Sequence, residues 1–246
     1  MLAWQEIDTV LLDMDGTLID LHFDNYFWQR LVPERWGQER GMPLDDARRE
    51  LEPIFAAVAG TLNWYCIDYW SEQLGLDILA LKREIADKVR WRADSRPFLE
   101  ALRHSGRQLF LFTNAHPDSL ALKIQRTALD QYLDGLYSTH EFGTSKEHQS
   151  CWQALHERLA FEPARTLFID DSQRILLAAR QFGIAHLLGI LNPDSQQPHQ
   201  QFADIPAISD YGVLIPDLLA HSRHSDGQIP ARKRHSSLAE DDAPQL

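Results

Sequence analysis

The sequence lacks several features that would assign it to a specialised class. It has only two cysteines, Cys66 and Cys151, which lie far apart. A disulfide scaffold is therefore not expected, and a reducing, cytoplasmic setting is favoured. No positively charged segment followed by an apolar run and a small-residue cleavage site opens the chain, so we expect no secretory leader. The longest apolar runs have the length of strands and are too short to span a bilayer.

Positive charge is also scarce. The 246 residues contain 24 lysines and arginines against 36 aspartates and glutamates, which gives a net charge of −12. Nucleic-acid polymers are not expected as partners of such a chain, because binding them requires basic side chains that neutralise their phosphates. A small anionic ligand is compatible with this net charge only if a metal cation or a local lysine reverses the electrostatic field at the site.

The sequence contains no internal repeat.

The chain alternates short apolar runs with segments of helical spacing. The runs that predict buried strands are residues 9–13, 108–114, 136–139, 166–170 and 186–191. The helical segments are residues 98–103, 119–132, 148–160 and 172–182, with Gly106 and Gly183 placed where helices should end. This alternation predicts an α/β fold with a Rossmann-like parallel sheet covered by helices on both faces. Chemistry is then expected beyond the carboxyl ends of the strands.

Residues 21–93 interrupt this alternation. They contain five of the seven tryptophans and no convincing strand, and their apolar residues fall at helical spacing. One helix face is expected to carry Leu62, Tyr65, Cys66, Tyr69, Trp70 and Leu74. We therefore expect a helical cap over residues 21–93, inserted between the first and second strands of a core made of residues 1–20 and 94–220. Residues 221–246 are polar and lack periodicity, which predicts a disordered tail.

Two carboxylates follow the first strand, in the sequence Asp13-Met14-Asp15-Gly16-Thr17. Asp13 ends the strand, and Asp15 faces the same side two residues later. Carboxylates this close repel each other, which raises the pKa of at least one unless a cation is bound. An ordinary surface turn at a strand end is the alternative explanation.

A second acidic pair, Asp170-Asp171, ends the strand of residues 166–170 and precedes Ser172. Asp and Ser are also common helix N-caps, so this pair alone is ambiguous. If the first and fourth strands are neighbours, however, four carboxylates converge at one edge of the sheet. Carboxylate and carbonyl oxygens together with a substrate phosphate form the kind of site that suits Mg²⁺.

Two further motifs complete the candidate site. Thr113 and Asn114 end the second strand, where a hydroxyl and backbone N–H groups can hold phosphate oxygens. Lys146 lies in a loop before a helix and could supply a cation to balance the acids. Each motif alone is weak, because Thr-Asn often begins a loop and a loop lysine is usually solvated.

Taken in order, the DxDGT, TN, lysine and DD motifs resemble those of the haloacid dehalogenase superfamily of phosphotransferases. The segments FDNYFWQRLVPERWG, TLNWYCIDYWSEQLGLDI, TNAHP and NPDS are similar to the bacterial purine 5′-nucleotidases of that superfamily. The resemblance implies a phosphatase that hydrolyses a small phosphate monoester, GMP or IMP, by way of a phosphoaspartate.

The resemblance also implies a role for each motif residue. Asp13 would be the nucleophile, and Asp15 the general acid and base. Thr113, the Asn114 backbone and Lys146 would hold the phosphate, and Lys146 would also pair with Asp13. Mg²⁺ would be held by Asp13, the Asp15 carbonyl and Asp171, with Asp170 binding directly or through water.

Several alternatives remain open at this stage. Asp15 favours phosphate esters over haloacids, because a halide leaving group needs no acid, but a sugar-phosphate phosphatase or mutase would use the same residues. An inactive binding or regulatory protein on the same fold is a further alternative, although every motif residue is present. The cap lysines Lys82 and Lys88 do not obviously suggest Schiff-base chemistry.

A second tier of residues has no predicted catalytic role. Asp20, Asp24 and Asn25 lie near the expected leaving group, where they could instead cap a helix. His116 closely follows Thr113-Asn114 and could face the pocket, or be an ordinary loop histidine. The aromatic side chains of the cap could stack on a base, but at helical spacing they usually form a core. The sequence does not indicate an oligomeric state.

Overall fold

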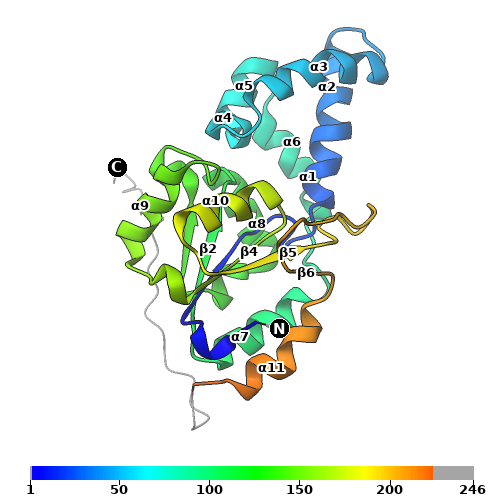
Figure 1. Ribbon diagram of the computed structural model, residues 1–246. Coiled ribbons are helices and arrows are strands. Elements are labelled where there is room, and N and C mark those ends of the chain that lie inside the picture. Colours follow the sequence, from blue (N-terminus) through cyan, green and yellow to red (C-terminus); the bar gives the residue numbers. More distant parts are fainter. Residues whose placement is uncertain (1, 224–246) are drawn as a thin grey trace, which may run out of the picture.

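The computed structural model describes residues 2–223, and these form a parallel six-stranded sheet with the order β3-β2-β1-β4-β5-β6 (Figure 1). The strands are β1 (Thr9–Leu12), β2 (Gln108–Thr113), β3 (Gly135–Ser138), β4 (Thr166–Asp170), β5 (His186–Ile190) and β6 (Ala207–Ile208). Every residue of β1 and β4 is buried, as expected for central strands covered on both faces.

Helices cover both faces of the sheet. Side chains alternate along β1, so that Val10 and Leu12 pack on one face while Leu11 packs on the other. The first face is covered by α7 (Ser95–His104), α8 (Pro117–Thr127) and α11 (Ile215–Ala220). The second is covered by α9 (Gln149–Leu159) and α10 (Gln173–Phe182). The predicted fold class is confirmed.

The strand register brings the candidate motifs to one edge. Leu12 lies level with Leu111 of β2 and Ile169 of β4. The residues that follow these three positions therefore leave the sheet side by side, and β1 and β4 are neighbours as the acidic pairs require.

The insertion between β1 and β2 is helical and lies beyond the carboxyl ends of the strands (Figure 1). Its elements are α1 (His22–Tyr26), a π-helical turn (Phe27–Leu31), α2 (Val32–Glu39), α3 (Leu44–Val58), α4 (Leu62–Tyr65), α5 (Ile67–Leu74) and α6 (Ile78–Glu84). Its core is built on the buried ring of Trp70, which contacts the rings of Trp28, Phe55 and Trp64.

Two of the predicted helices are interrupted. The single helix expected across residues 62–74 is wrong, because Cys66 is extended (φ −86°, ψ 115°) and instead caps α5, where its Sγ accepts a hydrogen bond from Tyr69 N. The helix expected over residues 119–132 ends at Thr127, because Ala128 adopts the left-handed conformation with φ 53°. Gly183 ends α10 as predicted, with φ 111°.

At the other end of the chain, the described residues return to the core. The backbone N–H of Arg223 donates to the Ser105 carbonyl at 3.1 Å. From residue 224 onward, the predicted tail (221–246) lies outside the described residues. Within residues 2–223, no helix combines the length and the apolar character that crossing a membrane requires.

Candidate active site

A buried lysine joins the first and fourth strand ends. Lys146 Nζ lies 2.6 Å from Asp13 Oδ1 and 2.7 Å from Asp170 Oδ2, and it donates to the Phe112 carbonyl at 3.1 Å. The lysine is buried, which alone would lower its pKa, but the two carboxylates raise it above the ordinary value. The ammonium therefore stays charged and holds Asp13 in a fixed orientation.

At this edge, Asp171 has less compensating positive charge than Asp13 and Asp170, which both pair with Lys146. Burial and the neighbouring carboxylates of Asp170 and Asp13 raise its pKa well above the ordinary value. One carboxylate oxygen from each of these three residues lies within 4.8 Å of the others. The same causes act on Asp13: burial raises its pKa to about 6, although Lys146 opposes that shift. The cluster thus holds more negative charge than Lys146 neutralises.

Gly16 allows this close approach. It has φ +81°, and a Cβ atom built there would lie 2.6 Å from Asp171 Oδ2. Only glycine accepts both the left-handed backbone and the missing space without strain. The DxDG spacing therefore brings the loop after β1 against the acids after β4.

The Thr-Asn motif positions the lysine loop. Asn114 Oδ1 accepts a hydrogen bond from Lys146 N at 2.9 Å, and its Nδ2 donates to Glu147 Oε2 at 3.2 Å. Thr113 Oγ1 accepts from Ala115 N at 3.1 Å and reaches the same cavity. The Asn114 side chain is therefore committed to the protein, as expected if only its backbone serves a ligand.

A second buried lysine, Lys123 of α8, was not predicted from the sequence. Its Nζ lies 2.5 Å from Asp15 Oδ1 and 2.6 Å from Asp24 Oδ2, and the side chain is fully buried. Asp24 Oδ1 is bound in turn by Lys82 of α6 at 2.9 Å. The signal was available, because Lys123 lies between Leu122 and Ile124 in an amphipathic helix, where a buried charge requires a partner.

These charged side chains shift the pKa of Asp15. Burial raises the pKa of Asp15 to about 6, with Lys123 acting against the shift and Asp24 and Asp13 adding to it. Burial would also raise the pKa of Asp24, but Lys123 and Lys82 lower it well below its usual range. A carboxyl group with a pKa near 6 can both give and accept a proton close to neutral pH.

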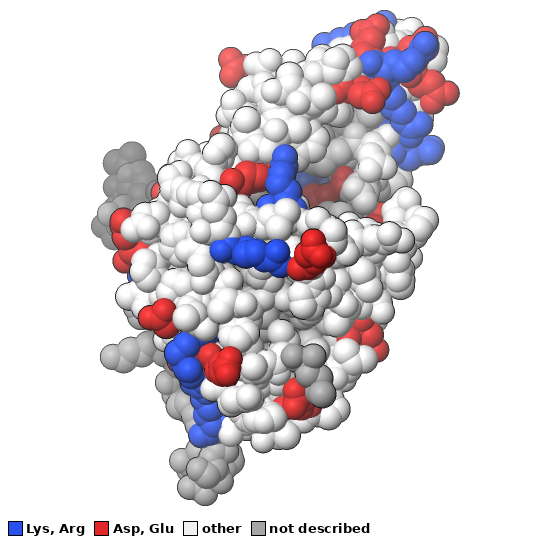
Figure 2. All heavy atoms as spheres, viewed as in Figure 1, with Lys and Arg blue, Asp and Glu red and all other residues white. Residues whose placement is uncertain are grey.

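A cavity of about 400 Å³ joins these groups to the insertion. Its floor includes Asp13, Asp15 and Lys146, and its lining from the insertion includes the rings of Trp28, Phe55, Trp64 and Tyr65. Figure 2 shows acidic and basic side chains around the hollow between the insertion and the sheet core. The expectation that Tyr65 belongs to the helical core is wrong, since its hydroxyl donates to Glu147 Oε1, outside the insertion, at 2.8 Å.

Three of the four second-tier residues lie at the cavity. Asp24, Asn25 and His116 line the cavity, whereas Asp20 does not. Asp20 Oδ1 instead accepts from His22 N at 3.0 Å and from Ser195 N at 3.1 Å, which is a structural role. All six motif residues (Asp13, Asp15, Thr113, Lys146, Asp170 and Asp171) line the cavity together with Asn114.

The sheet order, the helical insertion and this arrangement of acids around a buried lysine define a class of hydrolase. Residues 7–183 match the family model of the haloacid dehalogenase-like hydrolases, and the chain belongs to that family. The chain is 54% identical over 218 residues to the GMP/IMP nucleotidase YrfG of Escherichia coli (strain K12), which covers 89% of this chain and 98% of that protein.

Further matches are more distant in sequence. The phosphatase MT3486 of Mycobacterium tuberculosis (strain CDC 1551 / Oshkosh) is 27% identical over 72% of this chain and 85% of its own. Among solved structures, a HAD phosphatase from Thermococcus onnurineus superposes with a TM-score of 0.73 at 22% identity, covering 89% of this chain and 100% of that chain. This likeness shows a common fold.

Proposed function

We propose that the enzyme is a Mg²⁺-dependent phosphatase that hydrolyses the purine nucleoside 5′-monophosphates GMP and IMP through a phosphoaspartate on Asp13. The observation that carries the proposal is the pairing of two carboxyl groups on the cavity floor. Asp13 is held by Lys146, and Asp15 has a pKa of about 6. The nucleotidase relatives support the phosphoric monoester hydrolase that the sequence predicted.

In the first step, a carboxylate oxygen of Asp13 attacks phosphorus and the bond from phosphorus to the ester oxygen breaks. Asp15 gives its proton to the leaving alkoxide, which departs as the nucleoside. Lys146, the Thr113 hydroxyl and the Asn114 backbone N–H stabilise the phosphoryl oxygens. Positioning and charge stabilisation of this kind supply most of the rate enhancement in phosphoryl transfer.

In the second step, Asp15 is a carboxylate and accepts a proton from water. The water oxygen attacks phosphorus, and the bond from phosphorus to the Asp13 oxygen breaks. Inorganic phosphate leaves, and both carboxyl groups return to their starting states. Division of the hydrolysis at a covalent intermediate replaces one difficult step with two easier ones.

The residues at the strand edge suit Mg²⁺. The donors would be carboxylates of Asp13 and Asp171 and the backbone carbonyl of Asp15, with Asp170 binding directly or through water. These are the hard oxygen ligands that Mg²⁺ prefers, and the raised pKa of Asp171 reflects an excess of negative charge that a cation would relieve. When bound, the cation would neutralise charge on the phosphate and on the attacking carboxylate.

We further propose that residues 21–93 act as a cap over a core of residues 1–20 and 94–220. The rings of Trp28, Phe55 and Trp64 on the cavity wall offer a surface on which a purine can stack. Cys66 and Cys151 are both free thiols, which agrees with a reducing, cytoplasmic setting.

The first test is phosphate release from GMP, IMP, AMP, UMP and several sugar phosphates, with Mg²⁺ and with a chelator. We expect preference for GMP and IMP and loss of activity with the chelator and in Asp13→Asn. Metal-dependent release mainly from sugar phosphates would keep the chemistry and contradict the substrate. Release that survives in Asp13→Asn would contradict the covalent mechanism.

A further inference from the structure

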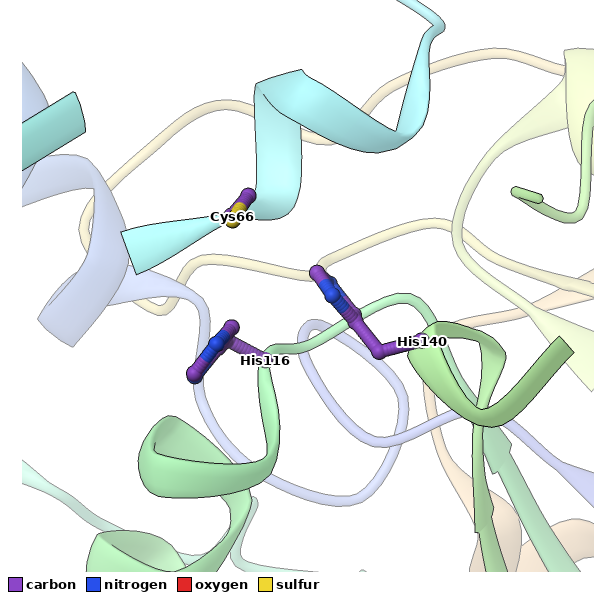
Figure 3. A group of neighbouring side chains, drawn as sticks. All are labelled: Cys66, His116 and His140. Carbon is purple, nitrogen blue, oxygen red and sulfur yellow. The ribbon is translucent and has the colours of Figure 1, made fainter. Parts of the chain in front are cut away.

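A second group of metal-ligating side chains lies beside the cavity, at the contact between the cap and the core. Cys66 comes from the break between α4 and α5, His116 from the residue before α8, and His140 from the short helix after β3 (Figure 3). One donor atom from each lies within 4.8 Å of the other two. The three segments are remote in sequence, and the fold brings them together.

His140 presents an unused nitrogen. Its Nε2 is buried and has no hydrogen-bond partner, so the ring's hydrogen bond with the Asn114 backbone involves Nδ1. Burial and the neighbouring His116 lower the pKa of His140 to about 4, so the ring is neutral at pH 7. A neutral imidazole with its other nitrogen fixed by a carbonyl is the usual form of a histidine ligand.

The other two donors, His116 and Cys66, each have polar contacts that orient them. Asp118 Oδ2 lies 3.7 Å from His116 Nδ1, and Asp68 Oδ2 lies 3.6 Å from His116 Nε2. His116 Nδ1 accepts the backbone N–H of Asp118 at 3.3 Å. Metal binding through Nε2 therefore requires the tautomer with the proton on Nδ1, in which Asp118 Oδ2 replaces that bond as the partner of Nδ1. Cys66 Sγ accepts the N–H of Tyr69 at 3.5 Å, which fixes the orientation of the thiol at the start of α5.

We propose that Cys66, His116 and His140 bind a thiophilic divalent metal ion, Zn²⁺ foremost, which ties the cap to the core. Tetrahedral Zn²⁺ holds its N and S ligands about 3.3–3.7 Å apart, so small side-chain rotations complete the site from the separations present. Asp68 or water supplies the fourth position. Mg²⁺ does not compete here, because it prefers oxygen ligands.

Zn²⁺ at this position slows turnover. Cys66 belongs to the cap, whereas His116 and His140 belong to the core, so one ion bonded to all three resists cap opening. Release of a nucleoside from beneath the cap requires that opening. This consequence rests on the proposed function, but the metal site itself does not.

The binding test uses the full chain without substrate and with excess Mg²⁺, which occupies the acidic cluster. Zn²⁺ is titrated against a chromogenic chelator. The wild type is expected to hold one Zn²⁺ that Cys66→Ser and His140→Gln bind at least about 100-fold more weakly. Cys151→Ala and His104→Gln are the matched controls and should keep wild-type affinity. Serine is a good helix N-cap, so Cys66→Ser should preserve α5.

Cobalt gives a second readout of the same ligands. Co²⁺ added to the wild type should produce a thiolate-to-cobalt charge-transfer band that is retained in Cys151→Ala and absent from Cys66→Ser. Equal Zn²⁺ affinity in the wild type and Cys66→Ser, or a cobalt spectrum without a thiolate band, would overturn the site.

The last experiment tests whether bound Zn²⁺ restrains the cap. Zn²⁺ should slow phosphate release by the wild type more than by Cys66→Ser at saturating Mg²⁺, and inhibition that is equal in the two proteins would overturn the proposed effect on the cap. Absence of nucleotidase activity would contradict the proposed function and leave both binding readouts unaffected.

Discussion

Lys123 Nζ lies 2.5 Å from Asp15 Oδ1, across 108 positions of sequence. The lysine also binds Asp24, so one buried ammonium sets the charge around the proposed proton donor. The pKa of Asp15 therefore depends on a residue of α8 as well as on the residues of its own loop.

The first prediction concerns the pH dependence of kcat/KM, whose alkaline limb should follow loss of the Asp15 proton. Lys123 lowers the pKa of Asp15 and Asp24 raises it. Lys123→Met should therefore move the limb to higher pH, by about one unit or more, and Asp24→Asn should move it to lower pH. Shifts in the same direction would contradict this account. Thermal unfolding of both variants checks that they remain folded.

The second prediction concerns the Asp15 side chain itself. Asp15→Asn should lower kcat for GMP roughly 10²–10⁴-fold, because a general acid and base is lost. The first step should be less affected for an aryl phosphate, whose leaving group needs little protonation. Rapid-quench measurement of phosphoenzyme formation with the two substrates tests the difference, and equal losses would argue against Asp15 as the acid.

The third prediction compares two glycines with left-handed backbones. Both Gly16→Ala and Gly143→Ala impose a positive φ on alanine, at a cost of about 1 kcal/mol each. Only the Gly16 methyl group meets Asp171, since a Cβ at Gly143 has open space around it. Gly16→Ala should therefore also raise the Mg²⁺ concentration needed for half-maximal activity, whereas Gly143→Ala should not.

The fourth prediction tests base stacking with two tryptophans. Trp64 lines the cavity, whereas Trp91 packs against Tyr132 outside the cavity lining. Trp64→Leu should raise KM for GMP about tenfold, in line with about 1–3 kcal/mol for one stacked base. KM for ribose 5-phosphate should hardly change, and Trp91→Leu should alter neither value. A parallel rise for both substrates would assign Trp64 to cap packing.

The fifth prediction concerns stability at acid pH. A hydrogen bond from Arg165 lowers the pKa of Asp8 to about 2, with Arg223 also contributing. Because the folded-state pKa lies below the unfolded value near 4, the stabilisation is complete above pH 4 and is lost as the pH falls toward 2. Denaturant unfolding should show Asp8→Asn less stable than wild type at pH 6, with the gap shrinking below pH 4. Asp45→Asn, an exposed control, should show no such gap.

Much of the fold was accessible from sequence because local rules decide it. Buried parallel strands give continuous apolar runs, and the DxDGT and DD motifs follow two of them directly. The errors arose where tertiary contacts override periodicity. Cys66 has helical spacing with Trp70 but is extended, and Tyr65 bonds Glu147 rather than joining the helical core.

The charge network was missed for a related reason. The apolar neighbours of Lys123 indicate a buried charge but do not identify its partners, and Lys82 is an ordinary helix residue by sequence. Asp24 receives one lysine from α8 and the other from α6. No spacing rule joins residues 24, 82 and 123. Lys146 was found because its place in an ordered set of motifs identified it, although a single loop lysine carries little signal.

The position of Asp24 has a thermodynamic consequence. This carboxylate accepts one hydrogen bond from Lys82 of α6, in the insertion, and one from Lys123 of α8, which also donates to Asp15. Displacement of α6 changes the field at Asp24, and through Lys123 it changes the acidity of Asp15. By reciprocity, protonation of Asp15 alters the free energy of displacing α6 by the same amount. The position of α6 and the proton affinity of Asp15 are therefore thermodynamically coupled.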